Sequence, residues 1–202
     1  MRIGILADIH EDVDGLRNAL RCLQGIGVDQ IVVLGDVFDT GKKIKETVQL
    51  LADSGAVGVF GNHDLGFCHE PDERLLEKYG GDVCCYMASL RQKLEMEGCL
   101  FCHGLPHWEA TDPVVYYLAG KPEEDGVVEE CFRAVSHKTI IVGHFHRWFI
   151  ATEDGPLSWD GESRLALKKE DRFLVVVGAV CDGWCAVFDT ESSELNPVKF
   201  HL

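Results

Sequence analysis

The sequence predicts an α/β fold in which a largely parallel sheet is followed by short antiparallel strands. Runs of branched apolar residues, such as Arg2–Ala7 and Gln30–Leu34, have the length and composition of buried strands. Between them lie stretches with apolar residues at helical spacing, such as Val13–Leu23, which is the alternation of βαβ units. Near the end of the chain, short strand-like runs are separated by turn residues, which is typical of an antiparallel sheet.

Each element follows from its local pattern. In the first half we expect strands over Arg2–Ala7, Gln30–Leu34 and Ala56–Phe60, helices over Val13–Leu23 and Lys43–Leu51, and a mostly helical stretch over 65–98 with a helix start at Pro71-Asp72-Glu73. In the second half we expect helices over Pro113–Leu118 and Glu123–Val135, and strands over Cys99–His103, Thr139–Gly143, Arg147–Ala151, Leu165–Leu167, Phe173–Val177 and Cys185–Phe188. The last four strands are expected to close a second sheet.

Length and composition restrict the possible classes of protein. The 202 residues, 46% of them hydrophobic, fit a single domain over 1–202 with a sizeable core. The formal charge of -15 argues against general nucleic-acid binding. Because we find neither a membrane-spanning run nor a signal-peptide core, we expect no membrane association. The odd number of cysteines, 9, is unlike a secreted disulfide framework, so we expect reduced thiols and a cytoplasmic protein.

Polar clusters follow five of the predicted strands. They are Asp8-Ile9-His10, Gly35-Asp36-Val37-Phe38-Asp39, Gly61-Asn62-His63-Asp64, His103-Gly104 and Gly143-His144-Phe145-His146. Because the carboxyl ends of parallel strands share one edge of a sheet, these clusters should converge. Carboxylate, amide and imidazole ligands suit Mn, Fe, Co, Ni or Zn. Seven candidate ligands exceed the need of one tetrahedral ion, so we expect two divalent ions and a bridging carboxylate.

In this order, the motifs Asp-x-His, Gly-Asp-x-x-Asp, Gly-Asn-His-Asp, His-Gly and Gly-His-x-His resemble the calcineurin-like metallophosphoesterase superfamily over residues 8–146. The resemblance implies a four-layer α/β/β/α sandwich of two mixed sheets with a dinuclear metal site, manganese or iron being favoured. It also implies hydrolysis of a small phosphorylated substrate, a phosphodiester or a phosphomonoester, by attack of a metal-bridging hydroxide. The oligomeric state stays open.

The resemblance assigns a role to each matching residue. Asp8, His10 and His146 would bind the first metal, Asn62, His103 and His144 the second, and Asp36 both. His63 matches the proton donor of the family, and Asp64 would orient or tune its imidazole. Asn62 is also a candidate for contacting the substrate. Arg147 and His107 follow metal ligands closely and are further substrate candidates, although an ordinary strand or loop position explains each of them too.

The sequence departs from known branches of this superfamily. Thr40 stands where the phosphoprotein phosphatases carry an arginine, and Asp64 where they carry a glutamate, which counts against that activity. The chain is more similar to small bacterial and archaeal phosphodiesterases. Many of these have cysteine at the position of His63, and they usually carry Asn-Pro-Gly-Ser where this chain has Val177-Gly178-Ala179-Val180.

Two other functions compete with this interpretation. A non-catalytic metal-binding scaffold of the same fold would have no need for His63 in addition to seven metal ligands. A thiol-based redox or zinc protein would need a paired-cysteine cluster. The spacing Cys99-x-x-Cys102 lies in a strand pattern, so buried structural cysteines are favoured there.

Overall fold

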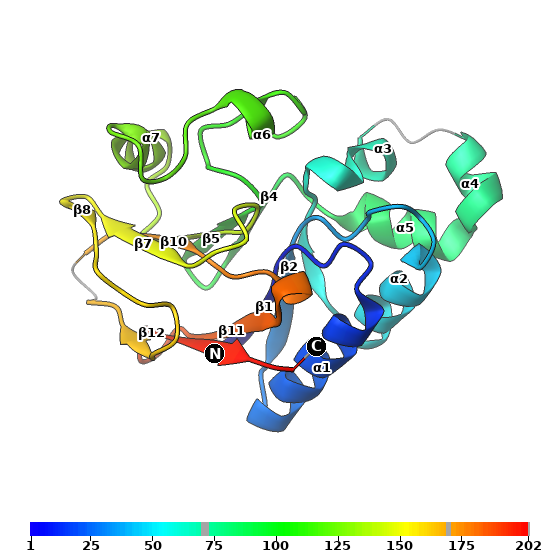
Figure 1. Ribbon diagram of the computed structural model, residues 1–202, viewed down its shortest axis with the longest axis horizontal. Coiled ribbons are helices and arrows are strands. Elements are labelled where there is room, and N and C mark those ends of the chain that lie inside the picture. Colours follow the sequence, from blue (N-terminus) through cyan, green and yellow to red (C-terminus); the bar gives the residue numbers. More distant parts are fainter. Residues whose placement is uncertain (70–72, 169–170, 202) are drawn as a thin grey trace.

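Two mixed sheets of six strands each form the framework of the computed structural model, which describes residues 1–69, 73–168 and 171–201 (Figure 1). The first sheet has the order β3 (Val57–Val59), β2 (Gln30–Leu34), β1 (Arg2–Leu6), β11 (Trp184–Asp189), β12 (Glu194–Lys199) and β9 (Leu165–Ala166). The second has the order β4 (Lys93–Met96), β5 (Cys99–Cys102), β6 (Thr139–Val142), β10 (Phe173–Val176), β7 (Phe149–Thr152) and β8 (Gly155–Pro156).

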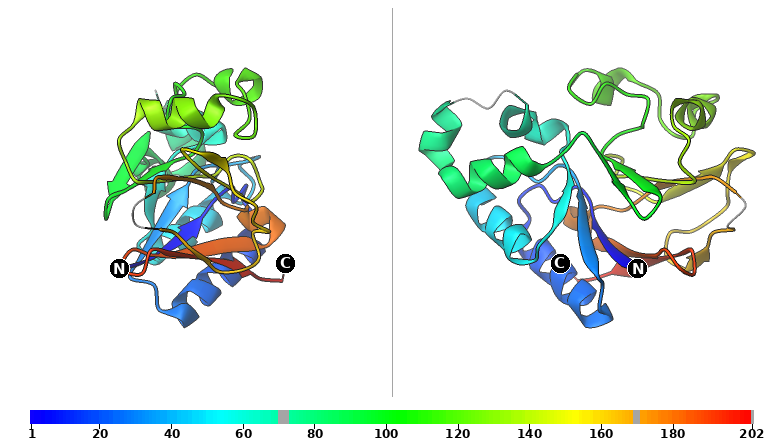
Figure 2. Two further views of the ribbon diagram at one scale, coloured as in Figure 1. Left: turned by 90° about the vertical axis from the view of Figure 1, so that its left-hand side faces the viewer. Right: turned by 180° about the vertical axis from the view of Figure 1, so that it is seen from behind.

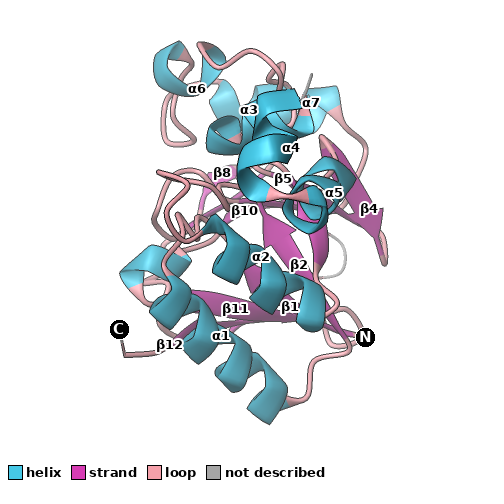
Figure 3. Ribbon diagram, turned by 90° about the vertical axis from the view of Figure 1, so that its right-hand side faces the viewer, coloured by secondary structure: helices cyan, strands magenta, loops and turns pink. Residues whose placement is uncertain are grey.

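Helices cover the outer face of each sheet (Figures 2 and 3). The first sheet carries α1 (Val13–Ile26), α2 (Ile44–Asp53), α3 (Leu65–Cys68), α4 (Glu73–Tyr79) and α5 (Gly81–Ser89), and the second carries α6 (Val115–Leu118) and α7 (Val127–Ala134). Two short 3₁₀ turns, η1 (Asn62–Asp64) and η2 (Val180–Asp182), follow β3 and β10. None of the helices in the described ranges is long and apolar enough to cross a membrane.

Three apolar cores separate the four layers, because alternate residues of a strand face opposite sides of its sheet. On β2, Val33 packs among the helices α1–α5, whereas Val32 faces the second sheet. Phe101 of β5 fills the space between the sheets, and its neighbour Leu100 packs under α7 with Phe132. Both faces of the central strands are therefore buried, which explains their nearly continuous apolar sequence. The expected four-layer α/β/β/α sandwich is confirmed.

The strands that precede the polar clusters come from two sheets rather than one. β1, β2 and β3 are parallel neighbours in the first sheet, whereas β5 and β6 are parallel neighbours in the second. The clusters converge because the carboxyl ends of both sets of strands meet at the same end of the sandwich, as the contacts between them show below.

The end of the chain does not close the second sheet by itself, contrary to expectation. β11 pairs antiparallel with β1 and therefore extends the first sheet, which β12 and β9 then continue. β10 pairs with β6 in parallel and with β7 antiparallel, so it lies inside the second sheet. The late strands are thus divided between the two sheets, and both sheets are mixed.

Three strands were not expected, the shortest of which is the two-residue β8. Lys93–Met96 lies within the stretch expected to be mostly helical but forms β4, because it pairs antiparallel with β5. Glu194–Lys199 forms β12 although it contains Pro197. Of the expected helix start, Pro71 and Asp72 lie outside the described residues, and α4 begins at Glu73.

Candidate metal centre

The loops after β1, β2 and β6 contain an unusual amount of left-handed backbone. Six of the eight non-glycine residues with positive φ in the described ranges lie there: Asp8, His10, Glu11, Asp36, His144 and His146. Such residues each cost about 1 to 3 kcal/mol and persist only where surrounding contacts hold them. Hydrogen bonds between the loops supply this support, since Asp8 N donates to Gly35 O and His10 N to Asp36 O. Strain gathered at one end of the sandwich indicates a functional site.

Two buried carboxylates form the centre of this site. Asp8 is fully buried and its carboxylate accepts the His144 backbone N–H at 3.0 Å, while Asp36 accepts that of His63. Burial raises the pKa of Asp8 to about 7, and the negative charge of Asp36 acts in the same direction. Burial also acts to raise the pKa of Asp36, but the adjacent His103 imidazole outweighs it and holds that pKa below its usual range.

Asp8, His10 and His146 form the first group of candidate ligands. The Nε2 atoms of His10 and His146 lie 3.3 Å apart, and His146 Nε2 lies 3.7 Å from Asp8 Oδ1. Two imidazole nitrogens at such a distance need a proton or a cation between them. A spacing of this size is also what two nitrogens show when each lies about 2.1 Å from one ion. The first group therefore fits a divalent metal.

Asn62, His103 and His144 form the second group, and Asp36 lies beside it. His103 Nε2 lies 3.1 Å from Asn62 Oδ1 and 3.4 Å from Asp36 Oδ2. Burial acts to lower the pKa of His103, yet Asp36 and Asp8 raise it to about 9. A field of negative charge that holds a proton on a buried imidazole also favours a bound cation. The second group therefore fits a divalent metal as well.

Backbone carbonyls determine which nitrogen each histidine of the second group presents. Leu34 O lies 2.6 Å from His103 Nδ1, and Tyr116 O lies 3.1 Å from His144 Nε2. A carbonyl only accepts, so these two nitrogens carry the proton. In the neutral rings, the lone pair is therefore on Nε2 of His103 and on Nδ1 of His144. The carbonyls thus set the tautomers that a bound metal would require.

All seven expected ligands therefore lie in one cluster, with Asp36 between the two groups. Asp36 Oδ2 lies 3.7 Å from His10 Nε2 on one side and 3.4 Å from His103 Nε2 on the other. This is the position that a bridging carboxylate requires. The donor set of carboxylate, amide oxygen and imidazole suits two borderline divalent ions.

His63 lies at the exposed rim of the cluster, whereas Asp64 is fully buried. The His63 ring packs edge-on against the His10 ring, with 4.8 Å between their centroids. The Asp64 carboxylate accepts hydrogen bonds from the backbone N–H groups of Val37, Phe38 and Gly61. Asp64 therefore holds the loops after β2 and β3 together. Its expected role in orienting or tuning the His63 imidazole stays a prediction.

Arg147 and His107 each lie beside a glutamate. The Arg147 guanidinium forms an ion pair with Glu123. His107 lies against α7, with Nδ1 3.6 Å from Cys131 Sγ and Nε2 3.5 Å from Glu130 Oε2. The contact of Arg147 with Glu123 is exposed, and a substrate role for Arg147 or His107 stays a prediction.

Several residues that support the site had not been identified from the sequence. The buried carboxylate of Glu11 accepts the backbone N–H groups of Asp39, Gly41 and Lys43, which fixes the loop after Asp36. Its place directly after Asp8-x-His10 was the available signal. The contribution of Tyr116 is a backbone carbonyl, so no side-chain motif could have revealed it.

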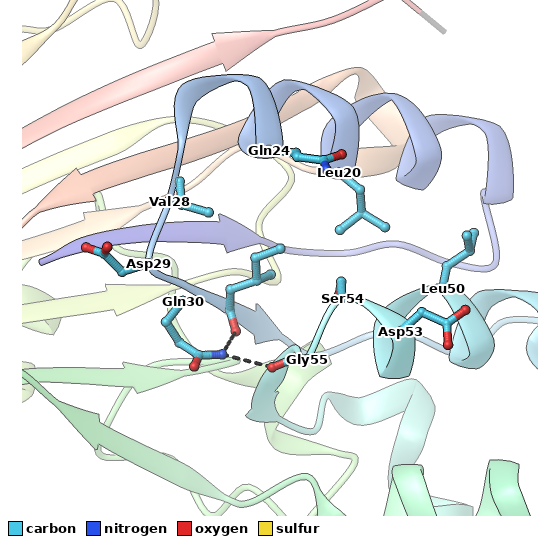
Figure 4. Close-up of a pocket in the computed structure, with 10 residues that line it drawn as sticks. Leu20, Gln24, Val28, Asp29, Gln30, Leu50, Asp53, Ser54 and Gly55 are labelled. Atoms are coloured by element: carbon cyan, nitrogen blue, oxygen red, sulfur yellow. Dashed lines mark hydrogen bonds between the residues drawn. The ribbon is translucent and has the colours of Figure 1, made fainter.

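A cavity of about 560 Å³ lies elsewhere in the molecule (Figure 4). It opens between α1 and α2 and is lined by residues such as Leu20, Leu50 and Asp53. Gln30, the first residue of β2, also lines it, so the cavity lies at the opposite end of β2 from Asp36. The cavity and the ligand cluster are therefore separate features.

Fold and site together define an α/β/β/α protein with a candidate dinuclear metal centre at the carboxyl end of its parallel strands. The chain belongs to the calcineurin-like phosphoesterase family, whose model matches residues 1–179. It is thus a member of a family of phosphoester hydrolases.

Individual relatives are distant in sequence. The uncharacterized protein MJ0912 of Methanocaldococcus jannaschii is 25% identical over 187 residues, which cover 88% of this chain and 75% of that protein. The crystal structure of a metallophosphoesterase from Sphaerobacter thermophilus has a TM-score of 0.75 and 22% identity, and the match covers 100% of this chain and 88% of that one. The structure of a novel archaeal phosphodiesterase has a TM-score of 0.56 and 17% identity, and the match covers 99% of this chain and 100% of that one. These likenesses support the fold.

Proposed function

We propose that this protein is a dinuclear-metal-dependent phosphoesterase that hydrolyses a small phosphodiester or phosphomonoester. The observation that carries the proposal is the position of Asp36, whose Oδ2 faces His10 on one side and His103 on the other. Bound divalent ions would polarise the phosphoryl oxygens and increase the acidity of a water molecule. Manganese or iron is favoured, since the donors are oxygen and imidazole nitrogen.

Each candidate ligand has a place in this proposal. Asp8, His10 and His146 would hold the first ion, Asn62, His103 and His144 the second, and Asp36 both. The Leu34 and Tyr116 carbonyls keep the second group in its binding tautomers. Asn62 lies at the open side of this group, half-buried, and can also contact substrate.

His63 would donate a proton to the leaving oxygen. Its backbone is fixed near the cluster because His63 N donates to Asp36 Oδ1 at 3.0 Å. Its ring is exposed beside His10, so an incoming substrate can reach it. General acid catalysis of this kind contributes typically about 10²–10⁴-fold to the rate.

The charges around the site favour a phosphodiester over a phosphomonoester. A diester carries one negative charge at neutral pH, whereas a monoester carries nearly two. The chain has a formal charge of -15, and Arg147, next to the ligand His146, is neutralised by Glu123. The likeness to an archaeal phosphodiesterase agrees with this preference.

The proposed location is the cytoplasm. Free cysteines, including the half-buried Cys68 and Cys181, are compatible with its reducing environment.

The proposal is tested by adding Mn²⁺, Fe²⁺ or Zn²⁺ to metal-free protein and measuring bound metal together with hydrolysis. Bis(p-nitrophenyl) phosphate and p-nitrophenyl phosphate serve as diester and monoester. We expect two ions per chain and a higher kcat/KM for the diester. Two bound ions without hydrolysis of either ester would instead support the alternative of a non-catalytic metal-binding scaffold.

A further inference from the structure

The turn η2 brings two side chains to the outward-facing nitrogen of His146. Asp182 Oδ2 lies 3.4 Å from His146 Nδ1, and Cys181 Sγ lies 3.7 Å from the same atom. The other nitrogen, Nε2, faces His10 and Asp8. His146 therefore lies between the candidate metal site and the side chains of Cys181 and Asp182.

The backbone of η2 is attached to the loop that carries Asp8. Val180 N donates to Ala7 O at 2.8 Å, and Cys181 N donates to Asp8 O at 3.3 Å. The Asp182 carboxylate is therefore positioned from the same loop that presents a ligand to the first ion. This coupling keeps the carboxylate, His146 and Asp8 in one arrangement.

His146 differs from His103 and His144 in the group that contacts the ring nitrogen pointing away from the metal site. His103 and His144 each donate to a backbone carbonyl, which does not depend on side-chain identity. His146 has left-handed backbone (φ 51°) and its side chain is 37% exposed, so its ring is less confined by packing. A side-chain partner is therefore needed to select its tautomer. A carboxylate is a much stronger acceptor than a thiol sulfur.

We propose that Asp182 is a positioning residue that accepts the Nδ1–H of His146 and so keeps the Nε2 lone pair directed at the first metal site. This inference rests on the proposed function, since it assumes a metal held by Asp8, His10 and His146. Carboxylate partners of metal-binding histidines fix the ring orientation and the tautomer. Their loss typically weakens metal affinity or activity about 10- to 100-fold.

The first test is a Mn²⁺ titration of metal-free protein by calorimetry. Asp182→Ala should weaken one of the two sites about 10- to 100-fold and leave the other unchanged. Asp182→Asn should retain most of the affinity, because its amide oxygen can still accept the hydrogen bond. The Asp182 side chain is 54% exposed, so its removal leaves no buried gap.

Two variants serve as controls. Cys181→Ala removes the weaker acceptor and should bind Mn²⁺ like the wild type. Asp53→Ala removes the same charge as Asp182→Ala, but from an exposed position at the end of α2 beside the cavity of Figure 4. It should also bind like the wild type, which would show that net charge is not the cause.

The second readout is the tautomer of His146 in the metal-free protein, measured from its ring ¹⁵N shifts. The His146 signals are identified by their loss in His146→Gln. The wild type should carry the proton on Nδ1, and Asp182→Ala should shift the population towards Nε2–H. A variant that is merely less stable would not show this shift.

The outcomes separate this inference from the proposed function. A wild type that fails to bind two ions would contradict the proposed function. If the wild type binds two and Asp182→Ala binds both equally tightly with an unchanged tautomer, only the role of Asp182 is wrong. Loss of affinity in Cys181→Ala but not in Asp182→Ala would overturn the choice of acceptor.

Discussion

The Nε2 atoms of His10 and His146 lie 3.3 Å apart, although 136 positions separate the two residues in the sequence. A divalent ion between them would stabilise the folded state, because it binds the folded chain and not the unfolded one. At 100 times the Kd this linkage is worth about 2.7 kcal/mol. Removal of metal by chelation should therefore lower the Tm by roughly 5 to 10 °C in scanning calorimetry. An identical Tm with and without Mn²⁺ would contradict metal binding.

Asp36→Asn should nearly abolish hydrolysis and weaken metal binding. Asparagine has the same shape, but it lacks the negative charge that holds two cations together beside His10 and His103. The measurement is kcat over a range of Mn²⁺ concentrations, together with metal content. Wild-type turnover of this variant at low Mn²⁺ would show that Asp36 does not bridge.

His63→Ala should lower turnover selectively for substrates with a basic leaving group. An alkoxide needs a proton as it departs, whereas nitrophenolate does not. We expect a loss of about 10²-fold or more on an alkyl diester and a small loss on a nitrophenyl diester. Metal content should not change. Equal losses on both substrates, or loss of a metal, would exclude His63 as the general acid.

Gly61→Ala should disrupt the site through a clash rather than through a lost group. A Cβ at Gly61 would lie 2.1 Å from Asp36 Oδ1 and 2.6 Å from Asp36 N, so the bridging carboxylate must move. Gly66→Ala is the matched control, since a Cβ there meets nothing within 4 Å. Metal affinity and kcat should fall in Gly61→Ala and stay at the wild-type level in Gly66→Ala.

Asp64→Ala should destabilise the fold. It would leave the buried N–H groups of Val37 and Gly61, and the partly buried N–H group of Phe38, without the acceptor they have in the folded state. A single unsatisfied buried donor costs about 1 to 3 kcal/mol, so we expect a loss of about 3 kcal/mol or more in urea unfolding. A loss below about 1 kcal/mol would mean that water replaces the carboxylate.

Much of the fold could be predicted because strands that are buried on both faces have continuous runs of apolar residues. β1 and β2 are buried on both faces, and their runs of Ile, Val and Leu indicated this. β4 reads Lys-Leu-Glu-Met, residues that also suit a helix, and only its pairing with β5 makes it a strand. In β12, Pro197 is unfavourable for a strand because proline has no N–H group to donate. It is tolerated because β9 covers only Glu194 and Leu195 on that side, which leaves Pro197 at an open edge.

The sequence was enough to predict the candidate metal ligands, but not the side chains that contact those ligands in the fold. Asp8-x-His10 and His144-x-His146 are short motifs, so local spacing was enough to propose them. Asp182 is 36 positions beyond His146 and meets it only because β11 lies beside β1. Arg147 is adjacent to a ligand in sequence, yet its guanidinium forms an ion pair with Glu123. Sequence proximity does not reveal in which direction a long side chain extends.

The pairing of β1 with β11 also sets the order of events when the protein is made. A ribosome delivers Asp8 long before Val180 and Cys181, whose N–H groups bind Ala7 O and Asp8 O. Until then β1 lacks its neighbour β11, and His146 lacks the Asp182 carboxylate. Under the proposed function, capture of the first ion would therefore wait until η2 has been made, and a shorter nascent chain would have no finished site for it.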